Sequence, residues 1–448
     1  MTTPVGFRHF TGSLLDECRS WRRRQHLKEY ADVRIAIVGS GVAGLTSAYL
    51  LHQHHDITLF EADDRLGGHA HTHQVESNGT FYPVDTGFMV FNHKCYPLLT
   101  RLFEELGIES RPSDMSFSVA DDAANLEWRS SNLLTIFAQT RNLARPTFWR
   151  MLRDITRFNK DAKAHLAAGA SSESLAEFLD RGDYSNGFVD FYLIPMGAAI
   201  WSADPTTFAH FPATSLFRFL DNHGLLSIYD QPKWRTVVGG SVQYVDAIAL
   251  RLGDGIRLSS PVLGVRREGH GVTVVTPHGE ESFDHVVMAT HADQALSVIQ
   301  EPTTAERDVL GALRFQPNQA TLHTDAALMP RRKRARASWN YRRLPGATVP
   351  TLTYDVSRLQ GHKGEETFYV TLNQADAVAP SKVIAQLEYA HPVFDGAAVA
   401  AQARHGEISG VDRISYAGAY WGYGFHEDGA RSGFVVAKAL GAPLDVVV

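Results

Sequence analysis

The most regular pattern of apolar and polar positions lies in the stretch RIAIVGSGVAGLTSAYLLHQHHDITLFEA, residues 34–62. A short run of apolar, mostly β-branched residues (35–38) predicts a buried strand. Glycines and a segment rich in alanine and leucine follow, and this order predicts a tight turn and then a helix. A second apolar run (57–60) ends at Glu61. The pattern therefore predicts one βαβ unit.

The glycines of this unit, Gly39, Gly41 and Gly44, have the spacing of a dinucleotide-binding turn. They allow a tight turn, a close approach of the backbone to a pyrophosphate, and close packing of the helix on the strand. The helix N-terminus attracts the phosphate charge. Glu61 can accept hydrogen bonds from ribose hydroxyls and disfavours a 2′-phosphate. The unit therefore predicts binding of NAD or FAD rather than NADP.

The segment DRLGG (64–68), which is separated from Glu61 by two residues, is a second candidate for binding phosphate. Arg65 supplies a fixed positive charge, and Gly67 and Gly68 leave backbone amides uncovered. We therefore expect this segment to lie against a phosphate of the same ligand.

Three histidines at alternate positions follow, His69, His71 and His73. On an extended strand they would point to one face and could converge on a metal ion. No convincing coordination set is completed by nearby acidic or cysteine residues, so we predict no metal site here.

Downstream of residue 95 the pattern changes three times. Residues 96–230 show helical spacing of bulky apolar and basic residues, which predicts a helical cap. Residues 231–300 contain a glycine pair, a helix pattern and alternating strands. Residues 301–405 hold β-branched and aromatic runs such as TFYVTLNQ, which predict a sheet, and 406–448 end in a strand, a loop and a helix.

Composition limits the class of protein. The chain has 448 residues, a net charge of −6 and 44% apolar residues, which is typical of a soluble protein of two or three domains. This charge argues against nucleic acid as a partner. Cys18 and Cys95 form no CxxC pair, which favours a reducing cytoplasm over a disulfide framework. We expect neither a signal peptide nor a membrane-spanning segment.

Two basic segments that contain aromatic residues, 18–30 and 330–343, allow two interpretations. Runs of charge are usually solvated faces or loops. They are also compatible with docking on the inner face of the cytoplasmic membrane. No pattern in the sequence predicts the oligomeric state.

The stretch GSGVAGL…FEADDRLGGHAHT resembles the nucleotide-binding and RxGG motifs of the superfamily of FAD-dependent amine oxidases and phytoene desaturases. The resemblance extends to YPVDTGFMVF, WRTVVGGS, VVMAT and GYGFHEDGARSG. It implies an α/β fold in which a Rossmann-like FAD-binding domain is interrupted by an α+β substrate domain. FAD is the implied cofactor, and the implied cofactor-binding residues are Gly39, Ser40, Gly41, Val42, Ala43, Gly44, Glu61, Ala62, Arg65, Gly67, Gly68, His69, Thr86, Gly87, Val262, Ala289, Thr290, Gly418, Asp428, Gly429 and Ala430.

The resemblance also divides the chain into six segments. A basic N-terminal extension (1–31) would precede the first part of the FAD-binding domain. The expected later segments are 32–95, 231–300 and 406–448 in the FAD-binding domain, 96–230 in the helical cap, and 301–405 in the sheet of the substrate domain. Gly87 would let the backbone approach the flavin ring, and the helix that starts near Gly429 would face the flavin's pyrimidine edge.

Three residues are candidates for the chemistry. His426 stands where amine oxidases of the superfamily carry one of the aromatic rings that hold the substrate nitrogen, and this difference weighs against amine oxidation. His426 is a candidate base or hydrogen-bond donor, or else a packed loop residue. Glu427 is a second candidate, with capping of a helix as the alternative. Tyr354 is a weaker catalytic candidate.

The combined motifs are similar to a bacterial branch of predicted NAD/FAD-binding proteins that are often encoded near cyclopropane-fatty-acid-synthase-like methyltransferases. By analogy, this implies hydride transfer from a C–H bond of an apolar substrate to flavin N5, with dehydrogenation or desaturation of an unsaturated or methyl-branched fatty acyl chain. One alternative is an amine or amino-acid oxidase. The other is a noncatalytic flavin-binding partner of a lipid methyltransferase.

Overall fold

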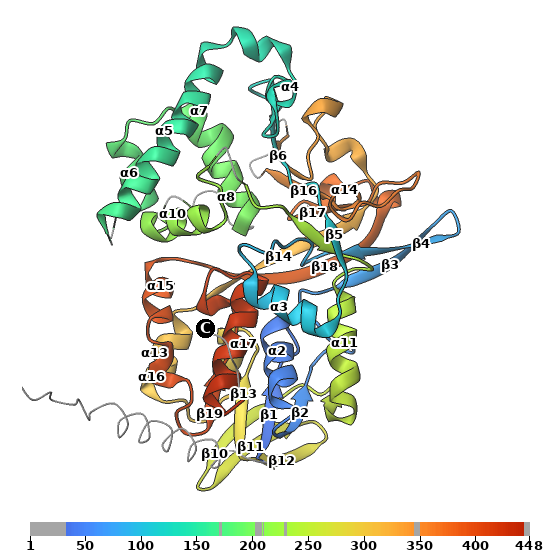
Figure 1. The fold of residues 1–448 in the computed structure, drawn as a ribbon, viewed down its shortest axis with the longest axis vertical. Coiled ribbons are helices and arrows are strands. Elements are labelled where there is room, and N and C mark those ends of the chain that lie inside the picture. Colours follow the sequence, from blue (N-terminus) through green and yellow to red (C-terminus); the bar gives the residue numbers. More distant parts are fainter. Residues whose placement is uncertain are drawn as a thin grey trace, which may run out of the picture.

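The computed structural model describes residues 33–169, 173–201, 208, 210–227, 231–344 and 350–442. Two layered units are stacked along the long axis of the molecule, a nucleotide-binding unit at the bottom of Figure 1 and a substrate unit at the top. The expected N-terminal extension (1–31) lies outside the described residues.

The lower unit is built on a parallel five-stranded sheet. Its strands, in order, are β19 (Ile414–Tyr416), β13 (His285–Met288), β1 (Arg34–Val38), β2 (Asp56–Phe60) and β9 (Ile256–Arg257). The two predicted apolar runs are β1 and β2. Successive residues of β1 enter different cores, because side chains alternate along a strand: Ile35 and Ile37 face one side, Ala36 and Val38 the other. The sheet is therefore buried on both faces, as its apolar sequence predicts.

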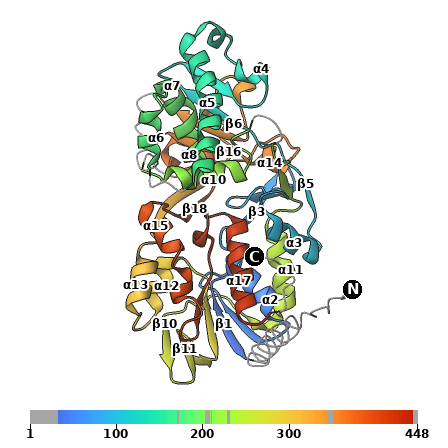
Figure 2. The same ribbon diagram turned by 60° about the vertical axis from the view of Figure 1, so that its left-hand side comes forward.

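Different helices and strands pack against the two faces of this sheet (Figure 2). The first face packs against α2 (Val42–Leu51), α3 (Pro97–Leu106), α11 (Val242–Leu252) and α17 (His426–Ala439). The second packs against an antiparallel sheet of β10 (Gly264–Glu268), β11 (Gly271–Thr276) and β12 (Gly279–Phe283), and against α12 (Ala292–Val298), α13 (Thr304–Gly311), α15 (Gly396–Gln402) and α16 (His405–Ile408).

The upper unit combines a sheet with a helical cap (Figure 1). The seven-stranded sheet has the order β18 (Val383–Pro392), β14 (Phe315–His323), β17 (Tyr369–Leu372), β16 (Thr351–Asp355), β15 (Trp339–Arg343), β6 (Phe117–Asp121) and β7 (Leu126–Arg129). The cap helices are α4 (Leu133–Ile136), α5 (Pro146–Ala168), α6 (Leu175–Arg181), α7 (Asn186–Phe188), α8 (Ile194–Trp201) and α10 (Ala213–Asn222). Phe158, Phe178 and Phe217 pack edge to face at the centre of the cap.

Short elements join the two units. They are the hairpin β3 (Thr72–Ser77) and β4 (Thr80–Asp85), the strand pair β5 (Ser110–Pro112) and β8 (Arg235–Val237), and the helix α14 (Val356–Gln360). None of the described helices is both long and apolar enough to cross a membrane.

Several expected boundaries differ from the packing. α3 lies after the expected boundary at residue 95, yet its buried residues join the nucleotide-binding core. The segment 96–230 is not purely helical, because β6 and β7 pair with β15 of the substrate sheet. Conversely, α13 and α15 fall within 301–405 but pack under the nucleotide-binding sheet. An apolar stripe predicts that a helix is buried, but it does not say in which core.

Candidate functional site

The first glycine turn has the geometry that its spacing predicts. Gly39 has φ +101° and donates its N–H to the carbonyl of Phe60 at 2.8 Å. A Cβ at Gly44 would lie 1.9 Å from the Gly39 carbonyl oxygen, so α2 packs directly on the turn. A Cβ at Gly41, the N-cap of α2, would have no atom within 4 Å. The open space therefore lies at the helix N-terminus, where a phosphate binds best.

Glu61 lies beside this turn. Its carboxylate accepts from the N–H of Ser40 at 2.9 Å, from the Ser40 hydroxyl, and from the N–H of Asp63 at 3.0 Å. The carbonyl of Glu61 accepts from Ser260 at 2.8 Å, which brings the segment that leads to Val262 next to the acid. Ala62 follows on the surface. Glu61 is thus held at the end of β2 where a ribose would lie.

The second glycine turn lies on the first. Gly67 has φ +110° and donates to the carbonyl of Ser40 at 3.1 Å. A Cβ at Gly68 would lie 3.2 Å from the Cα of Gly41. Arg65 donates to the carbonyl of Gly68 at 3.0 Å and stays half-buried at the same edge. The RxGG segment therefore brings its charge next to the α2 N-terminus.

Gly87 is required by a close contact with the backbone of His69. A Cβ there would lie 2.2 Å from the carbonyl oxygen of His69. That carbonyl accepts from the N–H of Phe88 at 2.9 Å. The hydroxyl groups of Thr86 and Tyr389 are 2.7 Å apart. Gly87 therefore allows a close approach to the chain after the RxGG turn.

Asp85, which precedes Thr86 and Gly87 in the chain, is a residue that sequence reasoning missed. Its buried carboxylate accepts from the N–H and hydroxyl of Ser241, from Thr72 and from Gln360. Burial raises its pKa to about 6. Asp85 thus joins the β3–β4 hairpin to α14 and to the turn at Gly239 and Gly240, which precedes Ser241. Only its place in the quoted motif VDTG could have pointed to it.

The C-terminal motif packs two helices in parallel. A Cβ at Gly429 would lie 2.5 Å from Cγ1 of Val42, and one at Gly433 would lie 2.8 Å from the carbonyl oxygen of Ala43. Ala430 is fully buried in the same core. These contacts put the N-termini of α2 and α17 side by side (Figure 1). Two helix N-termini, each positive, therefore open on one region, where they would stabilise an anionic group.

Other predicted residues of this motif support the helix itself. α17 begins at His426, three residues before the expected start. Asp428 accepts from the N–H of Phe425 at 3.1 Å and from Arg431 at 2.9 Å. Gly418 donates its N–H to the hydroxyl of Ser432 at 2.9 Å. On the other side, Ala289 donates to the carbonyl of Val38 at 2.8 Å and continues β13 beside the first turn, with Thr290 next to it.

Glu427 has the helix-capping contacts that we gave as the alternative to catalysis. It is buried, and its two carboxylate oxygens accept from the N–H groups of Leu98 and Leu99 at 3.1 and 3.0 Å. These groups lie in the first turn of α3 and have no partner within their own helix. Burial raises the pKa of Glu427 to about 7. Its task is to cap a helix.

Tyr354 and His426 both pack against other side chains. The hydroxyl of Tyr354 donates to the carbonyl of Ala199 at 3.3 Å, and the ring packs inside the substrate sheet. His426 stacks on Phe88 with ring centroids 3.8 Å apart. Burial lowers the pKa of His426 to about 3, so the ring is neutral and a weak base. A hydrogen bond from or to its Nε2 is the role that remains.

The unpaired polar atoms of this region fit a flavin nucleotide. Among the described residues, Nε2 of His69 and Nε2 of His426 are buried without a hydrogen-bond partner. Such atoms are costly unless a ligand pairs with them. Together with Glu61 and the two helix N-termini, they provide partners for a ribose, a pyrophosphate and a polar ring edge.

The three histidines at alternate positions, His69, His71 and His73, have different ring neighbours. His71 and His73 have ring centroids 4.1 Å apart on the β3 side, whereas His69 stacks between His391 at 5.4 Å and His291 at 6.2 Å. Burial lowers the pKa of all five histidines. In the described part of the chain, no three His, Cys, Asp or Glu side chains could hold a metal ion.

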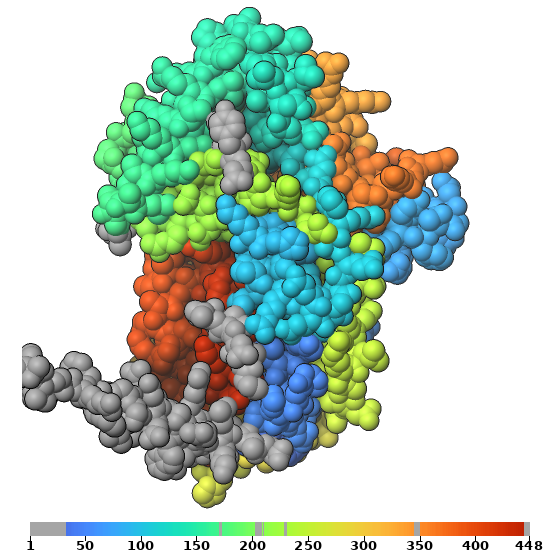
Figure 3. Space-filling view, in the orientation of Figure 1, coloured from blue at the N-terminus to red at the C-terminus, as the bar shows by residue number. Residues whose placement is uncertain are grey.

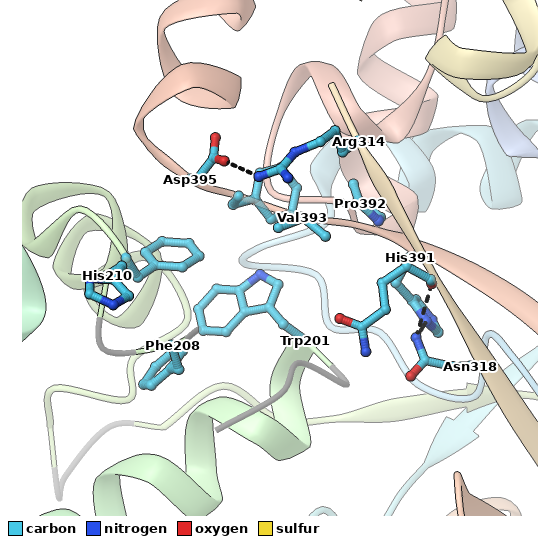
Figure 4. Close-up of a pocket in the computed structure, with 12 residues that line it drawn as sticks. Trp201, Phe208, His210, Arg314, Asn318, His391, Pro392, Val393 and Asp395 are labelled. Carbon is cyan, nitrogen blue, oxygen red and sulfur yellow. Dashed lines mark hydrogen bonds and ion pairs between the residues drawn. The ribbon is translucent and has the colours of Figure 1, made fainter. Parts of the chain in front are cut away.

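A cavity of about 220 Å³ begins at His391 (Figure 4). It lies between the cap and the carboxyl end of β18, and its walls are Trp201, Phe208, His210, Phe211, Arg314, Gln316, Asn318, His391, Pro392, Val393, Phe394 and Asp395. Six of these twelve side chains are aromatic or aliphatic, and the other six are polar or charged. His391 therefore connects the cavity to the stack at His69 and so to the RxGG turn.

Sequence comparison finds oxidases of amines and amino acids. The L-tryptophan oxidase RebO of Lentzea aerocolonigenes, a flavin-dependent enzyme, is 28% identical over 281 residues, 57% of this chain and 57% of that protein. AofH of Mycobacterium tuberculosis, named as a flavin-containing monoamine oxidase, is 27% identical over 284 residues, 60% of this chain and 59% of that protein. The chain thus spans less than two thirds of the length of these curated relatives.

Two solved structures share the fold over nearly the whole chain. Cyclohexylamine oxidase from Brevibacterium oxydans superposes with a TM-score of 0.67 at 18% identity and covers 92% of this chain and 99% of its own. A CLA-producing fatty acid isomerase from P. acnes gives a TM-score of 0.65 at 15% identity, covering 91% and 98%. The family model for flavin containing amine oxidoreductase matches residues 42–440. The chain belongs to the family of flavin-containing amine oxidoreductases.

Proposed function

We propose that the protein is an FAD-dependent oxidoreductase that removes a hydride from a C–H bond of an apolar acyl substrate, such as an unsaturated or methyl-branched fatty acyl chain. FAD, the cofactor that family membership implies, supplies the hydride acceptor when bound. The observation that carries the substrate class is the hydrogen-bond donor that His391 offers in a cavity of which half the lining side chains are aromatic or aliphatic.

A chain of hydrogen bonds assigns the tautomer of His391. The backbone N–H of Gln319 donates to Oδ1 of Asn373 at 2.8 Å, and a backbone N–H can only donate. The Nδ2 group of Asn373 therefore donates to Oδ1 of Asn318 at 2.6 Å. The Nδ2 group of Asn318 then donates to Nδ1 of His391 at 2.8 Å. Because Nδ1 is the acceptor, the ring proton lies on Nε2.

This tautomer favours a substrate with an oxygen acceptor. Burial lowers the pKa of His391 to about 4, so the ring is neutral and offers Nε2–H as a donor. A carbonyl or carboxylate oxygen accepts such a bond, whereas an ammonium group, which has only donors, meets a second donor. Asp395, the carboxylate in the cavity lining, is engaged by Arg314 at 2.6 Å and by the N–H of Ala398 at 2.8 Å. The aromatic walls suit the acyl chain.

Two other functions remain as alternatives. Amine or amino-acid oxidation has the support of the names of RebO and AofH. A noncatalytic role beside a lipid methyltransferase would need no turnover at all. The shared fold does not choose among them, since one solved neighbour is named for an amine and another for a fatty acid.

The test is a single-turnover experiment. The FAD-loaded protein is mixed without oxygen with free fatty acids, with phospholipids that carry unsaturated or methyl-branched chains, and with primary amines or amino acids. We expect acyl probes to bleach the visible flavin bands. Bleaching by amines alone, with release of ammonia and peroxide in air, would replace the proposal by amine oxidation. Flavin that stays oxidised with every probe, in a protein that forms a stable complex with a methyltransferase, would favour the noncatalytic role.

The variant Asn318→Asp tests the donor directly. A carboxylate at this position can only accept, so a neutral His391 ring carries its proton on Nδ1 and presents Nε2 as an acceptor. The rate of flavin reduction at limiting acyl substrate should fall by about tenfold or more, the cost of losing one hydrogen bond and facing two acceptors. Asn222→Asp, at the exposed end of α10, adds the same charge and should change nothing. Equal rates in Asn318→Asp and the parent would contradict the role of His391.

A further inference from the structure

The end of the cap that lies farthest from the nucleotide-binding unit carries exposed apolar side chains (Figure 1). We call it the apolar tip and define it by Leu133, Leu134, Leu143 and Trp149, which are 74%, 73%, 53% and 49% exposed. Single exposed leucines are ordinary, but four large apolar side chains within 17 residues of the chain are not.

The apolar tip is a defined surface. Leu133 and Leu134 lie on the single turn of α4, whose N-cap Asn132 and Thr135 form a reciprocal capping box. Trp149, in the first turn of α5, donates from Nε1 to the carbonyl of Leu143 at 2.9 Å. The ring of Phe137, at the end of α4, lies 5.3 Å from that of Trp149. Local hydrogen bonds and ring contacts thus hold these side chains outward.

The two chain segments that meet at the tip carry charged residues of one sign. The segment 129–153 contains five arginines and no acidic residue, although the whole chain has a net charge of −6. The 3-10 turn η5 (Lys333–Ala335) contacts α4, and the segment 330–344 contains seven basic residues and no acidic one. Part of this charge is used within the protein, since Arg331 pairs with Asp122 and Arg332 with Glu127.

Other cationic side chains at the tip form no ion pair with the described residues. Lys333, Arg334, Arg141 and Arg150 are exposed, and none of them has an ion pair with a described residue. Figure 3 shows the cap residues at the top of the molecule, away from the nucleotide-binding unit. Apolar side chains that project beside exposed cations match the interface of a bilayer with anionic headgroups.

We propose that the apolar tip docks the protein on an anionic membrane surface. Leu133, Leu134 and Trp149 enter the interface between headgroups and acyl chains, and the free cations lie against lipid phosphates. This inference does not depend on the substrate proposed above, because docking requires no turnover. It gives a structural basis to the second interpretation of the basic segment 330–343, whereas the segment 18–30 lies outside the described residues.

Vesicle sedimentation tests the proposal. The full-length, FAD-loaded protein is mixed with vesicles of phosphatidylcholine, with and without phosphatidylglycerol. We expect binding to the anionic vesicles, weaker binding to phosphatidylcholine alone, and loss of binding as salt is raised. No sedimentation with anionic vesicles at low salt would overturn the proposal.

Two double variants separate the apolar and the charged contributions. Leu133→Ser with Leu134→Ser should lower the partition coefficient by about tenfold or more. Lys333→Glu with Arg334→Glu should lower it by about thirtyfold on anionic vesicles, since each basic residue near such a surface contributes about 1 kcal/mol. Leu250→Ser, which removes an 85% exposed leucine from α11, is the matched control and should bind like the parent.

Three results would contradict docking. The first is equal loss of binding in Leu250→Ser and in the leucine double variant. The second is unchanged binding in both double variants while their flavin spectra and unfolding temperatures match the parent. The third is a dimer in solution that the leucine double variant converts to monomer without any change in vesicle binding, which would assign the tip to a second copy of the chain.

Discussion

Glu427 separates a structural from a catalytic interpretation, because its side chain caps a helix to which it does not belong. The N-cap residue of α3, Tyr96, forms no capping hydrogen bond through its side chain. The N–H groups of Leu98 and Leu99 depend on Glu427 instead. Glu427→Ala leaves both donors unpaired in the core, at about 1–3 kcal/mol each, so the loss of unfolding free energy should be about 2–6 kcal/mol. Glu427→Gln keeps one acceptor oxygen and should cost about half of that.

The pH dependence follows from the raised pKa of Glu427. Its value is about 7 in the folded protein, against 4.5 for an ordinary glutamate. Between these two pH values the folded state holds the proton more tightly than the unfolded chain, so this group makes the protein less stable as pH rises. The change is at most about 3 kcal/mol from pH 5 to pH 8, and it is absent in Glu427→Gln. The stability advantage of the parent over Glu427→Gln should therefore shrink with rising pH.

The assay has two readouts. Urea unfolding at a fixed concentration of FAD, followed at pH 5 and pH 8, gives the free energies of the parent and the two variants. Flavin reduction in a single turnover gives the rate of the folded protein. A variant that keeps its stability and loses about a hundredfold or more of that rate would refute the structural role and restore Glu427 as an acid or base.

Two further predictions concern the glycine turn and Tyr354. Gly41→Ala should keep the unfolding temperature and weaken FAD binding, measured by equilibrium dialysis, because its Cβ enters the open space at the α2 N-terminus. Gly44→Ala should instead lower the unfolding temperature, because its Cβ would lie 1.9 Å from a carbonyl oxygen. Equal effects of the two changes would disprove this division. Tyr354→Phe loses one hydrogen bond of 3.3 Å to Ala199 and should cost at most about 1 kcal/mol of stability. A large fall in the rate of flavin reduction would return Tyr354 to the active site.

The local part of the site could be predicted from sequence because it is made within one supersecondary unit. Gly39, Gly44 and Glu61 lie where the spacing places them, since strand, turn and helix lengths determine their positions. The capping role of Glu427 could not be chosen from sequence for the opposite reason. Its partners in α3, Leu98 and Leu99, lie 329 and 328 residues away, and no local pattern identifies them. The contact between Gly87 and His69, 18 residues away, has no local signal either.

Whether His391 presents a donor or an acceptor to the cavity also depends on residues that are distant in the sequence. The orientation of the Nε2–H of His391 depends on Asn318 of β14 and on Asn373, and finally on the backbone N–H of Gln319. Two of these links join residues 73 and 55 positions apart. Gln319 and Asn373 do not line the cavity, yet they decide whether His391 offers a donor or an acceptor there. Substrate preference in this chain should therefore respond to changes at Asn373, one hydrogen bond outside the cavity wall, as well as at the wall itself.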